Sequence, residues 1–285
     1  MIVSKPRLLF RPDPVLGWSL TPGHAVRVTF RDGVVQRIGA DGWRQVPGRS
    51  AATGPRLAVY GCSFTYGTGL ADEETYVARL QAALPELRLL NRGIGGQGTV
   101  QNLLQFRRDI AARAVDAAIF AIISDHRFRN IPHPSRMRQY LSLEWSSLGV
   151  EHVPVLRRGG AGRPRIVYLP IWQPVIARGG FEAFLPDDWM ITDATLAVLE
   201  MIREEAAAHR IPVGFALLDA LAPAFNTAVR ARCEACVEIS VPMDAAHTHM
   251  PHDRHPNAHA NALYAERLLP LARTLGAIAR RGEPA

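Results

Sequence analysis

The sequence predicts an α/β fold: a three-layer α/β/α sandwich built on a five-stranded parallel sheet, with a small β-rich extension in front of it. Two observations predict it. From residue 56 onward, short apolar runs alternate with longer segments of helical period, which is the pattern of parallel strands joined by crossover helices. Each apolar run is also apolar on both faces of its pleat, as strands buried within a parallel sheet are.

The expected elements follow in chain order. Strands are predicted at residues 57–60, 87–90, 117–123, 213–218 and 237–241. Helices are predicted at residues 73–84, 100–114, 194–208 and 257–280. Residues 131–190 are rich in proline and glycine and show no clear period, so we expect an insertion or a long covering loop there.

The extension is predicted to span residues 1–54. Residues 24–30 alternate between apolar and polar and lead into Arg31-Asp32-Gly33, and alternation that ends at an Asp-Gly pair is typical of a β-hairpin. We therefore expect two units, this extension and a main domain over residues 55–285 that carries the insertion.

Composition and charge exclude several classes of protein. With 48% hydrophobic and 21% charged residues in 285, the chain is neither disordered nor fibrous. Its longest apolar stretch, residues 117–123, is far shorter than the roughly 18–20 residues that a membrane span requires. The net charge of +7 comes from scattered arginines and not from one basic stripe, so nucleic-acid binding is not expected.

The N-terminus and the cysteines indicate a compartment. Prolines and arginines interrupt the first 14 residues before an apolar signal segment develops, so we expect a cytoplasmic protein. Three cysteines form an odd number in such a chain, which argues against a disulfide framework.

Ligands of open parallel sheets bind beyond the carboxyl ends of the strands, so the residues that follow each predicted strand are the candidates for chemistry. After the first strand, Ser63 lies in the glycine-flanked segment 61–69, at a strand-to-helix corner. Such a corner exposes a hydroxyl beside free backbone N–H groups, although the hydroxyl needs a base before it can act as a nucleophile.

A glycine-rich loop, residues 91–99, follows the second predicted strand. Glycine allows a backbone N–H to point closely at developing negative charge, and this is how an oxyanion hole is built. A dinucleotide site is the weaker interpretation, because no acidic residue ends a strand about 20 residues later.

The segment before the last helix supplies a base. Asp253 and His255 stand two positions apart, so the carboxylate can bind one imidazole nitrogen and leave the other free to accept a proton. Pro256 and Asn257 suit the start of the following helix.

Segments 61–69, 91–99 and 253–257 resemble blocks I, II and V of the SGNH/GDSL hydrolase superfamily, in the same order and at the same topological places. The similarity extends over residues 56–275, and residues 13–18 resemble the lead-in of some bacterial members. The resemblance implies flavodoxin-like topology and a serine esterase that cleaves an O-acyl ester of a small molecule, carbohydrate or lipid through an acyl-enzyme. It implies no metal or organic cofactor.

By this resemblance, Ser63 is the nucleophile, His255 the general base and Asp253 the residue that orients it. The backbone N–H groups of Ser63 and Gly96 are the expected oxyanion donors. An acyltransferase with the same triad, or a non-catalytic binding protein on the same fold, remains an alternative.

The chain departs from the family pattern at two places. Cys62 stands where block I usually has aspartate, which is not the triad acid. Block III normally supplies an asparagine to the oxyanion hole, but no G-x-N-D motif follows the third predicted strand. Ser124 and His126 are the expected replacements, and Asn130 is a weaker candidate.

Other interpretations stay open at this point. His126 and Arg129 could hold an anionic group of the substrate. An apolar lid over the site could be formed by Trp172, Phe184 and Trp189. Zinc ligands or a redox pair could be drawn from Cys233, Cys236, His247 and His249, although their spacing fits neither use well and both cysteines also suit one helix face.

Overall fold

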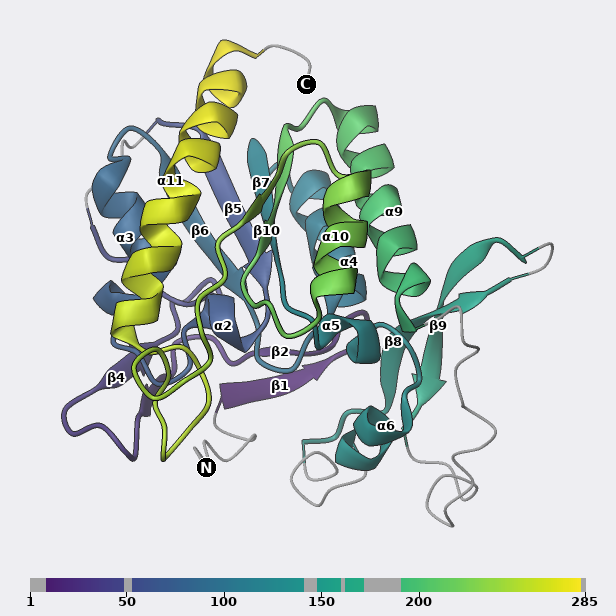
Figure 1. Cartoon of the computed structure of the whole chain (residues 1–285), viewed down its shortest axis with the longest axis horizontal. Helices are drawn as coiled ribbons and strands as arrows, with labels where there is room; N and C mark the ends of the chain where they lie inside the picture. Colours follow the sequence, from purple (N-terminus) through teal and green to yellow (C-terminus); the bar gives the residue numbers. More distant parts are fainter. Residues whose placement is uncertain (1–8, 49–52, 141–147, 160–161, 172–190, 283–285) are drawn as a thin grey trace.

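The computed structural model describes residues 9–48, 53–140, 148–159, 162–171 and 191–282. Its central strands are β5 (Arg56–Gly61), β6 (Arg88–Gly93), β7 (Ala117–Ile122), β10 (Val213–Leu217) and β11 (Cys236–Glu238). They form one parallel sheet in the order β11-β10-β7-β5-β6 (Figure 1). Counted along the chain from the β6 edge, this is the flavodoxin-like order 2-1-3-4-5. The predicted fold class is therefore confirmed.

Helices cover both faces of this sheet. They are α3 (Tyr76–Ala83), α4 (Thr99–Ala111), α9 (Asp193–His209), α10 (Pro223–Arg232) and α11 (Ala258–Arg281). α3 and α11 pack on one face and α4, α9 and α10 on the other (Figure 1). Only α10 was not expected, and its proline at the first turn is a common helix start.

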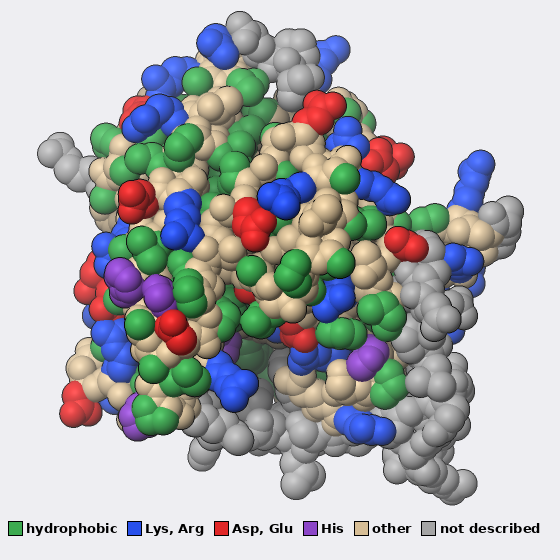
Figure 2. All heavy atoms as spheres, in the orientation of Figure 1, with side chains coloured by type: hydrophobic (Ala, Val, Ile, Leu, Met, Phe, Trp, Pro, Cys, Tyr) green, Lys and Arg blue, Asp and Glu red, His purple; other side chains and the backbone are tan. Residues whose placement is uncertain are grey.

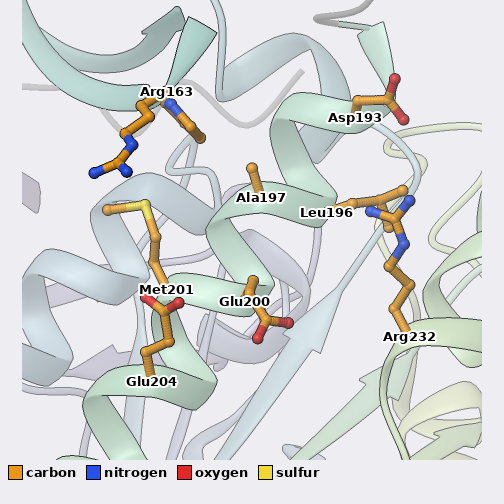
Figure 3. A pocket seen from close by; sticks show the side chains of 9 residues that line it. Arg163, Asp193, Leu196, Ala197, Glu200, Met201, Glu204 and Arg232 are labelled. Carbon is orange, nitrogen blue, oxygen red and sulfur yellow. The ribbon is translucent and has the colours of Figure 1, made fainter. Parts of the chain in front are cut away.

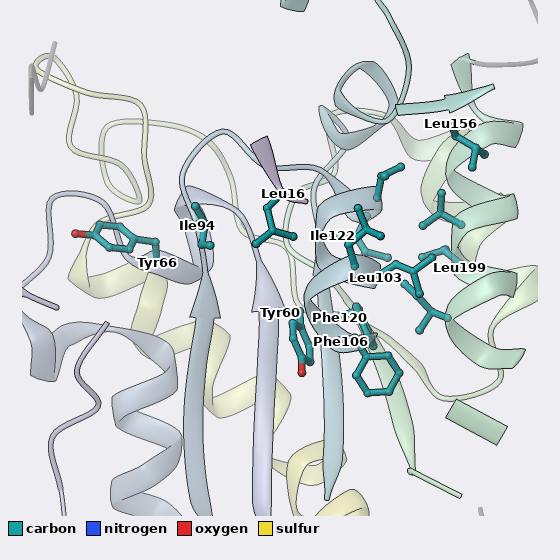
Figure 4. Packing of buried hydrophobic residues seen from close by; sticks show 14 of the residues in the cluster. Leu16, Tyr60, Tyr66, Ile94, Leu103, Phe106, Phe120, Ile122, Leu156 and Leu199 are labelled. Atoms are coloured by element: carbon teal, nitrogen blue, oxygen red, sulfur yellow. The ribbon is translucent and has the colours of Figure 1, made fainter. Parts of the chain in front are cut away.

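Strand β7 shows why the sequence folds this way. All six of its side chains are buried, and they alternate between two cores. Phe120 belongs to the core beneath α4, where it stacks on Tyr60 and meets Phe106 edge to face (Figure 4). Its neighbours Ile119 and Ala121 belong to the core beneath α3 and α11. The run is apolar at every position because both faces of the strand exclude water.

The extension is β-rich, as expected. β1 (Phe10–Asp13) pairs antiparallel with β2 (Gly17–Leu20), and β3 (Ala25–Arg27) with β4 (Val35–Arg37). Its apolar side chains complete the core beneath α4, where Leu16, Trp18 and Leu20 are almost wholly buried. The extension is therefore packed on the main domain.

The segment expected to lack regular structure contains some. After α5 (His126–Arg129) come α6 (Pro134–Tyr140) and an antiparallel hairpin of β8 (His152–Arg158) with β9 (Pro164–Pro170). The prolines at the edges of these elements hid their period. Trp172, Phe184 and Trp189 lie outside the described residues.

Charged side chains of both signs are mixed on the visible surface. Figure 2 shows arginines interspersed with acidic and apolar side chains over one face, with no single basic stripe. Among the described residues, no helix combines the length and hydropathy needed to cross a bilayer.

Candidate active site

The serine corner, residues 61–69, follows β5 directly. Helix α2 (Ser63–Tyr66) begins two residues after the strand ends. A Cβ on Gly61 would lie 2.1 Å from Thr65 Oγ1, so only glycine fits this turn. The Ser63 side chain and its N–H have no hydrogen-bond partner among the described residues, which leaves both free for a ligand.

Within segment 91–99, residues 93–98 join β6 to α4 and are here called the glycine loop, which lies against the serine corner. Ile94 N–H donates to the Gly61 carbonyl at 3.2 Å. The Asn91 side chain donates to the Thr65 carbonyl at 2.8 Å. Gly96 has φ +81°, a conformation that favours glycine, and its N–H has no acceptor within the described chain. Two unpaired backbone donors, from this loop and from Ser63, thus belong to adjacent segments.

The histidine loop, residues 244–257, holds the expected acid and base. Asp253 Oδ1 accepts hydrogen bonds from His255 Nδ1 at 2.5 Å and from the His255 backbone N–H at 2.6 Å. This contact makes Nδ1 the protonated nitrogen and leaves Nε2 to act as a base. Burial tends to raise the pKa of Asp253, but the hydrogen bonds and positive charge of His255 outweigh it and lower that pKa below its usual range. The carboxylate therefore stays ionised.

Contacts between α2, α3 and α11 bring this loop to the serine corner. Tyr76, the first residue of α3, shares a 2.8 Å hydrogen bond between its hydroxyl and Thr65 Oγ1. Its backbone N–H donates to Asn261 Oδ1 on α11 at 3.0 Å. The His255 ring lies 5.8 Å from the ring of Phe64, measured between centroids. Phe64 directly follows Ser63, so this ring contact brings the His255 loop to the serine corner. No hydrogen bond joins Ser63 to His255 among the described residues, and catalytic hydrogen bonds often tighten only when substrate is bound.

Asn130, the weaker candidate for the missing oxyanion donor, is hydrogen-bonded at both ends of its side-chain amide. Its Oδ1 accepts from Val100 N–H at 3.0 Å, and its Nδ2 donates to Thr195 Oγ1 at 2.8 Å. Both ends of the amide are thus used to join α4 to α9.

Ser124 and His126 remain as candidates. The Ser124 backbone N–H donates to Asp219 Oδ2 at 3.0 Å. His126 is fully buried, and burial lowers its pKa to about 3, so its imidazole is neutral. Its Nδ1 lies 3.2 Å from Thr99 Oγ1, directly after the glycine loop, while its Nε2 has no partner. A buried imidazole nitrogen without a partner is costly and calls for a function.

The chain was compared with known proteins in three ways. No family model matches the chain, and no curated protein matches it in sequence. Solved structures do resemble it. A G-D-S-L family protein from Desulfitobacterium hafniense DCB-2 is 12% identical, with 76% of this chain and 99% of that chain covered and a TM-score of 0.45.

Two further solved structures are esterases. The psychrotrophic esterase EstA from Pseudoalteromonas sp. is 12% identical, covers 77% of this chain and 97% of its own length, and has a TM-score of 0.43. An acetylxylan esterase from Geobacillus stearothermophilus is 15% identical, with 80% and 96% covered and a TM-score of 0.40.

The structure does not support the anion-anchor interpretation. Arg129 donates to Asp125 Oδ2 at 2.8 Å and to the Gln97 carbonyl at 3.0 Å. Arg129 therefore has two acceptors within the chain, although Asp125 is shared with Arg136. His126 carries no charge near neutral pH, so it offers no cation.

The zinc and redox interpretations also lose support. Cys233 ends α10 and Cys236 begins β11, so they do not share a helix face. Burial raises the pKa of the Cys233 thiol to about 11 and that of Cys236 to about 12, which keeps both protonated. Within the described ranges, no three His, Cys, Asp or Glu side chains are grouped as metal ligands. His249 packs instead beside Gly69 and Phe30.

One hollow of the surface lies away from these residues. A cavity of about 730 Å³ runs along α9, and its lining includes Asp193, Glu200, Glu204, Arg163 and Arg232 (Figure 3). None of the triad candidates lines it. Its side chains offer no nucleophile and base pair, so the site is assigned by chemistry and not by cavity size.

Proposed function

We propose that the chain is a serine hydrolase that cleaves an O-acyl ester of a small molecule, carbohydrate or lipid. The observation that carries the proposal is the Asp253–His255 pair beside a serine corner whose hydroxyl and N–H are unpaired. A nucleophile, a base oriented by a carboxylate and free backbone donors are the parts that acyl transfer requires.

The mechanism begins with attack of Ser63 Oγ on the acyl carbonyl carbon, while His255 Nε2 takes the hydroxyl proton. The resulting imidazolium is stabilised by Asp253, which remains ionised. Collapse of the tetrahedral intermediate breaks the ester bond, and the imidazolium gives its proton to the departing alcohol. An acyl-enzyme on Ser63 remains.

Water completes the cycle. His255 Nε2 takes a proton from water as its oxygen attacks the acyl carbon. The second tetrahedral intermediate then releases the carboxylic acid and returns the proton to Ser63 Oγ. No metal or organic cofactor enters this scheme.

The oxyanion is proposed to bind the N–H groups of Ser63 and Gly96 together with Nε2–H of His126. A neutral imidazole has one N–H, and a Thr99 hydroxyl that donates to Nδ1 places that N–H on Nε2. The lowered pKa of His126 suits this role, because the ring stays neutral while it donates. His126 would thereby replace the block III asparagine, and its unpaired Nε2 favours it over Ser124. Because Nε2 is buried, this role requires the packing over the ring to open when substrate binds.

Labelling of Ser63 tests the proposal directly. A fluorophosphonate probe should modify Ser63 in the parent, as shown by peptide mass spectrometry, and Ser63→Ala should be neither labelled nor active on p-nitrophenyl acyl esters. Equal ester hydrolysis by the parent and Ser63→Ala would rule out the mechanism, and hydrolysis by neither, without labelling, would favour a binding protein on this fold.

A further inference from the structure

The peptide group that joins Gly95 to Gly96 is held by a residue of the N-terminal extension. Trp18 is fully buried, and its indole N–H donates to the Gly95 carbonyl at 2.9 Å. The two residues are 77 positions apart in the chain. This contact therefore depends on how the extension packs on the main domain.

The direction of that carbonyl decides the direction of the Gly96 N–H. A trans peptide group is planar, so its C=O and N–H point to opposite sides. Holding the Gly95 oxygen toward Trp18 aims the Gly96 N–H away from Trp18. That N–H has no acceptor within the described chain, so nothing else in those residues fixes it.

A second contact prevents the loop from rotating about this point. Gln97 Nε2–H donates to the Trp18 carbonyl at 2.7 Å, so Trp18 is bonded to the residues on both sides of Gly96. Space is also restricted, because a Cβ on Gly95 would lie 3.2 Å from the ring of Phe10. Two side chains of the extension thus confine the same peptide group.

We propose that Trp18 is a positioning residue for the oxyanion hole, and that its indole N–H orients the Gly96 N–H toward the tetrahedral intermediate formed on Ser63. The inference rests on the proposed function. It assigns the extension a part in the reaction, although none of its residues touches the substrate in this scheme.

Trp18→Phe removes the indole N–H and keeps an aromatic ring in the core. The oxyanion exists only in the transition state and the intermediates, so kcat should fall while KM stays within about twofold. Loss of a whole donor costs about 10²–10³-fold in kcat, and a donor that is only misdirected should cost less, about tenfold. Trp43→Phe is the matched control, because Trp43 lies in the same extension and its indole N–H has no acceptor among the described residues.

A second variant separates orientation from packing. Replacing Trp18 by its benzothiophene analogue, introduced by codon suppression, keeps the shape of the bicyclic ring and removes only the N–H. It should lower kcat as Trp18→Phe does, with a parent-like thermal midpoint. Trp43→Phe should keep the parent's kcat and KM.

Three results would overturn the inference. Parent-like kcat in the benzothiophene variant would show that the hydrogen bond does not serve the reaction. A loss of kcat only in Trp18→Phe, accompanied by a lower thermal midpoint, would reduce Trp18 to a packing residue. Absence of fluorophosphonate labelling of Ser63 in the parent would instead refute the proposed function, and this inference with it.

Discussion

The glycine loop and the histidine loop occupy the same edge of the sheet, but they are held by different kinds of contact. Bonds to the glycine loop come from distant segments: those between Trp18 and the loop join residues 77 and 79 positions apart. Bonds within the histidine loop are local. The Asp253–His255 contact spans 2 positions, and the bond from Asn257 to the Ala246 carbonyl spans 11.

The two halves of the candidate site are therefore positioned in different ways. The histidine loop can form its acid and base pair from its own residues once α11 begins. The glycine loop depends on the extension and on α5, so its backbone is correct only when the whole domain is assembled. Substitutions in the extension should therefore affect transition-state stabilisation, and substitutions in the histidine loop should affect proton transfer or local stability.

The largest expected effect is on the histidine loop. His255→Ala should lower kcat/KM for p-nitrophenyl esters by about 10²–10⁴-fold, because it removes the general base. The fold should be retained, since the side chain is partly exposed and Asn257 still braces the loop. A thermal midpoint far below the parent's would show that the loop needs His255 for its structure. That result would contradict the view that its other local contacts hold the loop.

The glycine loop should respond differently to the loss of a donor beside it. His126→Leu should lower kcat by about 10²-fold, with KM little changed, because one oxyanion donor is lost. His126→Asn supplies an amide donor in its place and should be the more active of the two. Equal activity of the two variants at the parent's level would exclude His126 from the oxyanion hole.

The same contrast explains what the sequence could predict. The spacing of Asp253 and His255 predicted their contact, and the helix start at Asn257 was also correct, because both depend on residues a few positions apart. The five strands were predictable for a similar reason, since their apolar runs are local signals.

Contacts across long separations were not predictable. Nothing near Trp18 shows that its indole N–H meets Gly95, and nothing near Asn130 shows that both ends of its amide are used. Asn130 was the weaker candidate because it lies several residues beyond the third strand, and its amide proves to be hydrogen-bonded to α4 and α9. The contact between Ser63 and His255 stays a prediction.

Acid should lower the free energy of unfolding through two buried histidines, one beside the glycine loop and one in the histidine loop. The pKa of His126 is lowered to about 3 and that of His249 to about 4, in each case chiefly by burial. An unfolded histidine titrates near 6.5, so the unfolded chain binds more protons below that pH and stability is lost as the pH falls from about 6.5 toward 3–4. For His126, the loss by pH 5 should be about 2 kcal/mol, at about 1.4 kcal/mol per pH unit.

Urea unfolding at pH 7.5 and pH 5 separates the two contributions. His126→Leu should flatten the pH dependence more than His249→Leu, because His126 is fully buried beside the glycine loop, whereas His249 in the histidine loop is less so. An undiminished loss of stability between the two pH values in both variants would place the pH dependence on the carboxylates.

The smallest expected effect concerns the local bracing itself. Asn257 accepts from the N–H groups of His259 and Ala260 at the start of α11, and donates to the Ala246 and Thr248 carbonyls. Asn257→Ala should therefore cost about 1 kcal/mol in urea unfolding, the usual value of a lost helix cap. Thr192→Ala is the matched control, since Thr192 caps α9 without a side-chain bond, and it should change stability by less.

Activity of the same variant then shows whether local bracing matters for chemistry. If local contacts hold the Asp253–His255 pair together, Asn257→Ala should lower kcat/KM because it loosens those contacts. Trp18→Phe should leave the stability of the histidine loop unchanged and lower kcat through the glycine loop. Hydrogen exchange of the His249 and Asp253 amides, which donate within the loop, should increase in Asn257→Ala and not in Trp18→Phe. Equal exchange in the two variants would mean that the loops open together, and that the separation between local and distant bracing does not hold.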